Sequence, residues 1–348
     1  MSHHSSNTPS TESIPADALA EILLRVPPHP TCLARASLAG KGLRGHAPPL
    51  LGFFHDGGIH NASNFLPIGG SSNRVSAAAF DPMEPGWRVV DSRHGRVLLR
   101  SPDRLRFLVW EPMAGRRRYI DAPPPHHVEH YKFSNAALVC TTAHEEGHGN
   151  CHDCPLSIIF VVTPRRAGTT VATGDFSPLM ITERPVVLLQ NVLYWTMAGV
   201  MGSQEGILSF ELEAQRLYLI GQPAYIFDPE REHVQVMKVE DGKLGLVAAC
   251  GLSLQLWGLV EYNGEGRERW VLDRETYLDA DMAPPEPIFE DYYVIWILGV
   301  EGSIVFLRTE AGIFEVDLQT EEFKRLWDGN VIKTLYPYRS FYRQGSTI

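Results

Sequence analysis

The hydrophobic and polar positions along this chain change their period near residue 48. Between Ile14 and Leu43, apolar residues recur at intervals of three and four, and beyond Pro48 they occur in short runs separated by Gly, Pro, Asp and Asn. The first pattern lines one face of an α-helix, whereas short alternating runs are typical of β-strands. The sequence therefore predicts a short helical segment followed by a mainly β body.

Two short helices are expected in the helical segment. The first has apolar residues at i, i+3, i+4 and i+7, namely Leu19, Ile22, Leu23 and Val26. Pro15 suits its first turn, and Pro27 ends it. The second is expected to begin at Pro30 and to end at Gly40. Helices this short cannot bury their apolar faces alone, so we expect them to pack either on the β body or on a partner protein.

The β pattern repeats as hairpins. An apolar run with an aromatic and an acidic residue precedes a turn and a second apolar run, and this unit begins at Leu108, Leu208, Tyr225 and Ile313. A three-stranded meander is expected over residues 87–110. About 300 residues divided by roughly 40–50 per four-stranded blade predicts a β-propeller-like body of about six blades, with five or seven as alternatives. A double-sheet sandwich is the alternative, but it is typically shorter. Propeller closure predicts that residues 335–342 lie near residues 50–54.

Charge and composition exclude several classes of protein. The chain has 348 residues and a net charge of −10, which gives no attraction to a polyanion. The arginine runs at residues 116–118 and 165–166 are too short to follow a phosphate backbone, so we expect no nucleic-acid partner.

Residues 1–13 lack an apolar core and are expected to form a mobile tail. We expect no membrane-spanning helix, because no apolar run reaches about 18 residues. Five cysteines, odd in number, indicate the cytoplasm or the nucleus.

The helical segment resembles a known motif. Residues 14–27, followed by residues 33–38 and Lys41, are similar to the F-box in its plant form, in which a proline and an acidic residue precede a leucine-rich helix. The F-box docks on Skp1, the linker subunit of a cullin-RING ubiquitin ligase. The resemblance thus implies a contact with a Skp1-like protein, and through it with a cullin. The residues that it assigns to this contact are Ile14, Pro15, Leu19, Ile22, Leu23, Val26, Leu33, Leu38 and Lys41.

The F-box looks truncated. Gly40, Lys41, Gly42 and Leu43 stand where the family usually has Cys-Lys-x-Trp, and the pattern lacks the third helix that normally precedes the body. Losing a buried tryptophan removes about 3–5 kcal/mol of packing, so Skp1 binding is weakened or lost if the truncation affects the contact. The expected domains are a tail at residues 1–13, a truncated F-box at residues 14–45 and a β body at residues 46–348.

The β body carries a resemblance of its own. Residues 87–99, 109–112, 191–195, 251–257 and 336–342 are similar to the C-terminal domain of plant, especially grass-type, F-box proteins, in the same order. Such domains are thought to hold the protein that is to be ubiquitinated. The resemblance implies a substrate-recruiting adaptor of a Skp1–cullin–F-box (SCF) ligase. Two alternatives stay open, an interaction-only propeller that no longer couples to Skp1 and a propeller enzyme with a metal site.

Candidate chemical sites are few. Cys151 and Cys154, with His144 or His148 nearby, have the spacing of half a zinc site, but a second pair is lacking, so we expect a loop and no metal. Ser253 lacks the second glycine of a nucleophile elbow, and a hairpin turn is expected there. We therefore expect no catalytic residues, no cofactor and a non-catalytic protein, and the sequence assigns no target-binding residues. Six tryptophans are expected to pack in the sheets, namely Trp110, Trp195, Trp257, Trp270, Trp296 and Trp327.

Overall fold

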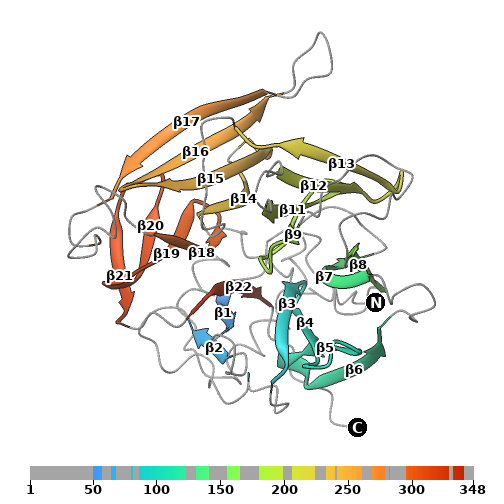
Figure 1. Cartoon of the computed structure of the whole chain (residues 1–348). Helices are drawn as coiled ribbons and strands as arrows, with labels where there is room; N and C mark the ends of the chain where they lie inside the picture. Colours follow the sequence, from blue (N-terminus) through green and yellow to red (C-terminus); the bar gives the residue numbers. More distant parts are fainter. Residues whose placement is uncertain are drawn as a thin grey trace, which may run out of the picture.

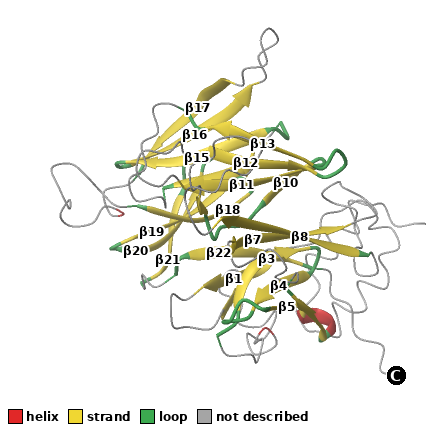
Figure 2. Ribbon diagram, turned by 45° about the vertical axis from the view of Figure 1, so that its right-hand side comes forward, coloured by secondary structure: helices red, strands yellow, loops and turns green. Residues whose placement is uncertain are grey.

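The computed structural model describes residues 50–56, 64–67, 80, 86–122, 131–140, 155–164, 180–198, 206–223, 233–239, 241–260, 269–278, 282, 295–328 and 332–340. No α-helix occurs within these ranges, and Figure 2 shows that they are almost entirely strands joined by turns. The chain is mainly β, as predicted. Residues 1–45, which include the expected tail and F-box segment, lie outside the described residues, and so does the loop from His144 to Cys154.

The described strands form six antiparallel sheets. The sheet that joins the two ends of the described chain contains β22 (Thr334–Arg339), β1 (Leu50–Asp56) and β2 (Asn64–Pro67). The next contains β3 (Arg88–Arg93), β4 (Arg96–Arg100), β5 (Arg106–Glu111) and β6 (Arg116–Asp121), with a 3₁₀ turn at Pro112–Ala114. A two-stranded sheet pairs β7 (Tyr131–Cys140) with β8 (Leu156–Pro164).

Three further sheets complete the set. One contains β9 (Met180–Ile181), β10 (Val187–Leu189), β11 (Val192–Ala198), β12 (Gly206–Glu211) and β13 (Arg216–Gly221). Another contains β14 (Val234–Lys238), β15 (Leu244–Cys250), β16 (Ser253–Val260) and β17 (Arg269–Tyr277). The last contains β18 (Trp296–Glu301), β19 (Ile304–Thr309), β20 (Gly312–Asp317) and β21 (Phe323–Trp327).

The sheets are arranged in a ring, as Figure 1 shows. Around the centre, β3 contacts β7 and β22, and β14 contacts β11 and β18. Among the described strands, five sheets have three or more strands and form the blades of a five-bladed propeller, while β7–β8 lies between two blades as a two-stranded sheet. The prediction of about six blades is therefore corrected to five. It assumed equal blades of average length, whereas the described strands between residues 131 and 164 number two.

The hydrophobic core lies between neighbouring sheets. Each of six buried clusters draws residues from two adjacent sheets of the ring. Phe54 is fully buried in one of them, and its ring centroid lies 5.4 Å from that of Tyr338 and 5.8 Å from that of Trp110. Alternating apolar residues on each strand serve both sheet faces, because successive side chains point to opposite sides. Every blade therefore shares its core with two neighbours.

The ring closes where the sequence predicted it. Strand β1 pairs antiparallel with β22, with Phe54 opposite Tyr336 and Leu50 opposite Arg339. The hairpins expected at Leu108, Leu208 and Ile313 are confirmed as β5–β6, β12–β13 and β20–β21. The meander is confirmed as β3–β4–β5. The hairpin expected at residues 225–229 lies outside the described residues.

The tryptophans mostly pack as expected. Three of them, Trp110, Trp195 and Trp257, are buried in the clusters between sheets. Trp270 and Trp327 are partly buried against such clusters. Trp296 lies under the guanidinium of Arg308, whose carbon is 4.1 Å from the ring centroid. Bulky aromatic side chains thus fill the wide spaces between twisted sheets.

Candidate functional site

A short segment of chain crosses the centre of the ring between β9 and β10. This segment, residues 182–185, is called the plug. From β7, the Asn135 side-chain amide donates hydrogen bonds to the carbonyl oxygens of Thr182 (2.9 Å) and Arg184 (3.2 Å). From β22, the Tyr336 hydroxyl donates to the carbonyl oxygen of Glu183 (3.1 Å). Strands of two different sheets thus hold the plug, and Figure 1 shows β9 near the centre.

Arg184 fixes the plug to the remaining sheets. Its side chain is buried, and its guanidinium donates to the carbonyl oxygen of Ile297 on β18 and to Oε1 of Gln235 on β14 (3.4 Å). Gln235 in turn donates from Nε2 to the carbonyl oxygen of Pro185 (3.4 Å). A buried guanidinium needs several acceptors to offset its loss of water, and its planar fork of donors can reach carbonyls on different strands. The plug therefore links blades that share no sheet.

At one end of β3, the plug meets a group of arginines. Arg88 and Arg100 lie directly opposite each other on β3 and β4. Like charges in such a pair repel each other. The carboxylate of Glu183 lies between them, with Oε1 3.1 Å from Nη2 of Arg100 and Oε2 3.7 Å from Nη1 of Arg88. The charge of Arg104 also lies close enough to Arg100 to lower the pKa of Arg100. Arg88, Arg100, Arg104 and Glu183 are together called the arginine mouth.

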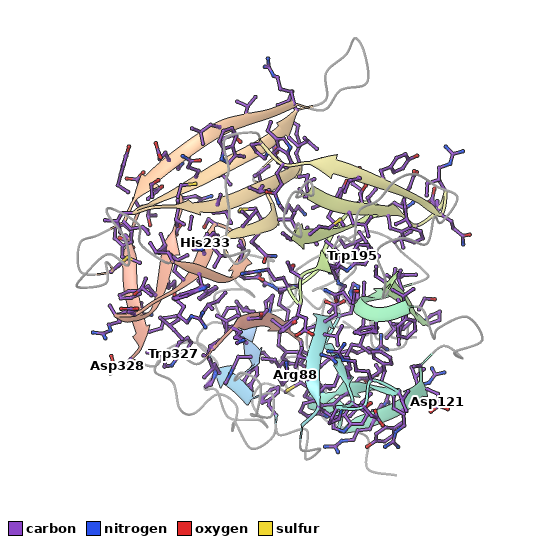
Figure 3. All side chains as sticks on the ribbon, viewed as in Figure 1. Arg88, Asp121, Trp195, His233, Trp327 and Asp328 are labelled. Carbon is purple, nitrogen blue, oxygen red and sulfur yellow. The ribbon has the colours of Figure 1, made fainter. Side chains whose placement is uncertain are left out.

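Burial differs sharply within the arginine mouth. The Arg100 side chain is 6% exposed and the Arg88 side chain 25%, whereas that of Glu183 is 52% exposed. Burial lowers the pKa of Arg100, the Glu183 carboxylate raises it, and the charges of Arg104 and Arg88 lower it further. The Arg100 guanidinium carbon also lies 5.7 Å from the centroid of the Phe133 ring. Figure 3 labels Arg88 beside β3. The mouth is therefore a group of arginines, one of them deeply buried, around the half-exposed carboxylate of Glu183.

A cavity lies toward the other end of β3, where Asp91, Ser92 and Arg93 line it, and Pro185 of the plug lines it as well. Its volume is about 950 Å³. Apolar side chains from β10, β14, β16 and the chain before β10 line it, among them Val186, Leu188, Val236 and Leu256. Charged side chains of both signs also line it, namely Asp91, Arg93, Lys238, Asp241, Lys243, Asp273, Arg274, Glu301 and Arg339. The cavity is thus apolar in part and nearly balanced in charge.

Several charged groups of the cavity are bonded within its wall. Arg339 donates from Nε to Oε1 of Glu301 (2.8 Å), and Arg274 donates to the carbonyl oxygen of Leu318 (2.8 Å). Arg93 donates to the carbonyl oxygen of Val186 (2.7 Å). A hydrogen bond from Lys243 lowers the pKa of Asp241. Paired charges around apolar surface suit a polypeptide segment, which brings apolar groups and hydrogen-bonding groups together.

The residues that the sequence singled out are placed as follows. All nine expected Skp1-contact residues, from Ile14 to Lys41, lie outside the described residues, and so do Cys151 and Cys154. Ser253 follows a turn in which Gly251 has φ of 60°, so the expected hairpin is confirmed. Its hydroxyl donates to Oε1 of Glu275 (2.9 Å). Among the described residues, no group of three or more His, Cys, Asp or Glu side chains is placed to hold a metal ion.

Sequence reasoning missed the plug and the arginine mouth. Residues 182–185 have no period that marks them as a central element. A signal for the mouth was present, because residues 86–122 contain nine arginines and no lysine. The consecutive arginines at residues 116–118 lie elsewhere, on the outer strand β6. Within the part of the chain that the structure describes, no helix is long and apolar enough to span a membrane.

Comparisons with known proteins assign this chain to no family. No family model matches the chain, and no curated protein matches it. One similar solved structure is a nidogen/laminin complex, at 10% identity and a TM-score of 0.40, covering 84% of this chain and 98% of that one. Another is a protein of unknown function from Bacteroides caccae, at 13% identity and a TM-score of 0.42, covering 84% of this chain and 100% of that one. At these scores the likeness carries no argument about function.

Proposed function

We propose that this protein is the target-binding adaptor of an SCF-type ubiquitin ligase. The observation that best supports a binding role is the cavity of about 950 Å³, which combines apolar lining with paired charges. It is built on strands that the plug and ring closure hold together, and rigid β scaffolds commonly carry recognition surfaces at the ends of their strands. The resemblance of residues 14–41 to an F-box supports the connection to the ligase.

The proposed mechanism is proximity and involves no chemical step on this chain. The propeller holds a target protein, and the N-terminal segment binds a Skp1-like protein that is joined to a cullin. Tethering raises the effective concentration of target lysines near the ubiquitin-loaded enzyme. The rate of ubiquitin transfer then depends on how far the propeller holds the target lysines from the ubiquitin-loaded enzyme and in which orientation. It needs no catalytic residue on this chain.

Binding to purified Skp1 tests the proposal. Wild-type protein should bind a Skp1-like protein at micromolar concentration or below, and Leu23→Asp should weaken binding by about tenfold or more, because it puts a charge into an apolar contact. Leu24→Asp is the matched control, since Leu24 lies on another face of the expected helix and should leave binding within about twofold. Failure of the wild type to bind at micromolar concentration contradicts the adaptor proposal.

A second candidate function keeps the propeller and omits the ligase. The departure at residues 40–43, where Gly40-Lys41-Gly42-Leu43 replaces Cys-Lys-x-Trp, favours it. In that case the protein binds its partners without Skp1 and competes with other proteins for them. Co-purification of a partner in the absence of any Skp1-like protein, together with a failed Skp1 binding assay, would support this candidate.

A further inference from the structure

The outer strand β6 carries three consecutive arginines on an exposed edge of the propeller. Arg116, Arg117 and Arg118, here called the arginine strip, begin this strand, and all three are exposed. Among the described strands, β6 is the last of its sheet and pairs only with β5. Figure 1 shows it on the outer rim of the ring. A partner can therefore reach the side chains of the strip, and also its backbone, because an edge strand presents unpaired backbone groups.

The charge of the arginine strip is neutralised only in part. Nη1 of Arg116 lies 3.9 Å from Oε2 of Glu111, whose other carboxylate oxygen lies 3.0 Å from Nε of Arg96. The acidic residue of β6 itself, Asp121, stands opposite Arg106 on β5. In the part of the chain that the structure describes, no carboxylate forms an ion pair with the other two arginines of the strip. The strip therefore has a surplus of positive charge that faces solvent.

The outer strands of the other blades balance their charges. On β21, Lys324 lies opposite Glu315, and Arg325 lies 3.1 Å from Asp328. The single arginine of β13 lies opposite Glu211, and β17 carries two arginines and two acidic residues. The whole protein has a net charge of −10. A basic edge is thus a particular property of β6.

The spacing of the arginine strip matches that of side chains on a neighbouring strand. Successive side chains point to opposite faces, so Arg116 and Arg118 share one face, about 7 Å apart, and Arg117 shares the other face with Tyr119. Tyr119 is 48% exposed, and the Arg117 guanidinium carbon lies 5.7 Å from the centroid of the Trp110 ring. A strand added to β6 places its side chains opposite these at the same spacing, where pairs of opposite charge are stabilising.

We propose that β6 binds an extended acidic segment of a partner protein, which adds to the sheet as an antiparallel strand and places carboxylates opposite the arginine strip. Main-chain hydrogen bonds then supply affinity, and the charges select the partner. The strip covers about 7 Å of strand, which matches three residues of a peptide and is too short to follow a polyanion. Among the described residues that line the cavity, none belongs to β6, so this site is separate from the proposed target site and does not depend on Skp1.

Fluorescence anisotropy with the full-length protein and three labelled peptides of about nine residues tests the proposal. The acidic peptide has three consecutive glutamates flanked by threonine and valine, and the neutral peptide has glutamine in place of glutamate. The interrupted peptide keeps the glutamates but has prolines in its flanks, which remove the backbone donors that a ladder needs. The acidic peptide should bind about tenfold more tightly than the neutral one and about fivefold more tightly than the interrupted one.

Charge-neutralising variants show whether the arginine strip is the binding site. Arg117→Gln and Arg118→Gln should each weaken binding of the acidic peptide by about twofold to fivefold, and the double variant by about tenfold. Arg269→Gln is the matched control, because it removes the same charge from the exposed start of the outer strand β17 of another sheet, and it should leave binding unchanged. Added salt should weaken binding of the acidic peptide to the wild type, since exposed charges are screened. Unfolding curves for each variant exclude loss of fold as the cause.

Three results would overturn the proposal. The first is equal binding of the acidic and neutral peptides, and the second is binding that the double variant leaves unchanged. The third is equal binding of the acidic and interrupted peptides, which contradicts strand addition. Retention by heparin without binding of the acidic peptide also contradicts a peptide site. The Skp1 assay is independent of all these outcomes, so failure of the strip and failure of the adaptor proposal are distinguishable.

Discussion

At the scale of single residues, Arg184 stands out because it is a buried charged side chain at the centre of the ring, where it bonds to two other sheets. Its guanidinium bonds the Ile297 carbonyl oxygen and the Gln235 side chain, and both acceptors are themselves buried. Arg184→Met should lower the free energy of unfolding by about 3 kcal/mol, since each buried polar group left without a partner costs about 1–3 kcal/mol. Urea denaturation measures this change.

Arg118→Met is the control for Arg184→Met, because Arg118 is exposed on β6 and the change should stay within about 0.5 kcal/mol. Equal stability of the two variants would show that the plug does not depend on the guanidinium. A large loss for Arg184→Met alone supports the plug as a structural link between sheets.

His55 predicts a specific dependence of stability on pH. It is buried on β1, and burial lowers its pKa from 6.5 to about 4. The folded state therefore binds fewer protons than the unfolded state between these values. The contribution of neutral His55 to the free energy of unfolding is fully present above pH 6.5. It is lost as the pH falls toward 4, and the free energy of unfolding then decreases by at most about 3 kcal/mol. His55→Leu should flatten this part of the profile, which thermal unfolding at several pH values measures. If the melting temperatures of wild type and His55→Leu depended on pH in the same way, this role of His55 would be contradicted.

At the scale of elements, closure by β22 holds the ring together. Removing β22 leaves an edge of β1 unpaired and takes Leu335, Tyr336 and Tyr338 out of two buried clusters. A chain that ends at residue 331 should therefore be insoluble or lack cooperative unfolding, because an exposed strand edge beside a broken core promotes aggregation. A chain that ends at residue 340 keeps every described strand and should fold, as circular dichroism and size-exclusion chromatography can show. Cooperative unfolding of the shorter chain would contradict the role of β22.

The elements differ in how far the sequence could predict them. Hairpins such as β5–β6 were predictable because their apolar period and turn residues are local. Closure by β22 was predictable because any propeller must join its ends. The number of blades could not be predicted, because an average blade length does not reveal the two-stranded sheet β7–β8. The plug could not be predicted either, since the hydrogen bond from Tyr336 to Glu183 joins residues 153 positions apart in the sequence. The arginine mouth has the same limit, because Glu183 lies 83 positions from Arg100.

At the scale of the whole molecule, stability is distributed around the ring. Six buried clusters connect each sheet to its neighbours, and the plug adds bonds across the centre. The cavity and the arginine mouth lie at opposite ends of β3. The plug takes part in both, because Pro185 lines the cavity and Glu183 lies between Arg88 and Arg100.

The whole molecule also predicts that its two expected parts are separable. Every described strand lies between Leu50 and Arg339, and the six clusters consist of residues from that range. A chain of residues 46–348 should therefore keep its melting temperature within about 2 °C of that of the full chain, which is under 1 kcal/mol for a protein of this size. The same chain should lose all binding to a Skp1-like protein. A fall of many degrees would show instead that the expected helices pack on the β body and complete its core. Leu23→Asp in the full chain separates the two cases, because it lowers the melting temperature if Leu23 packs on the body and leaves it unchanged if Leu23 faces a partner.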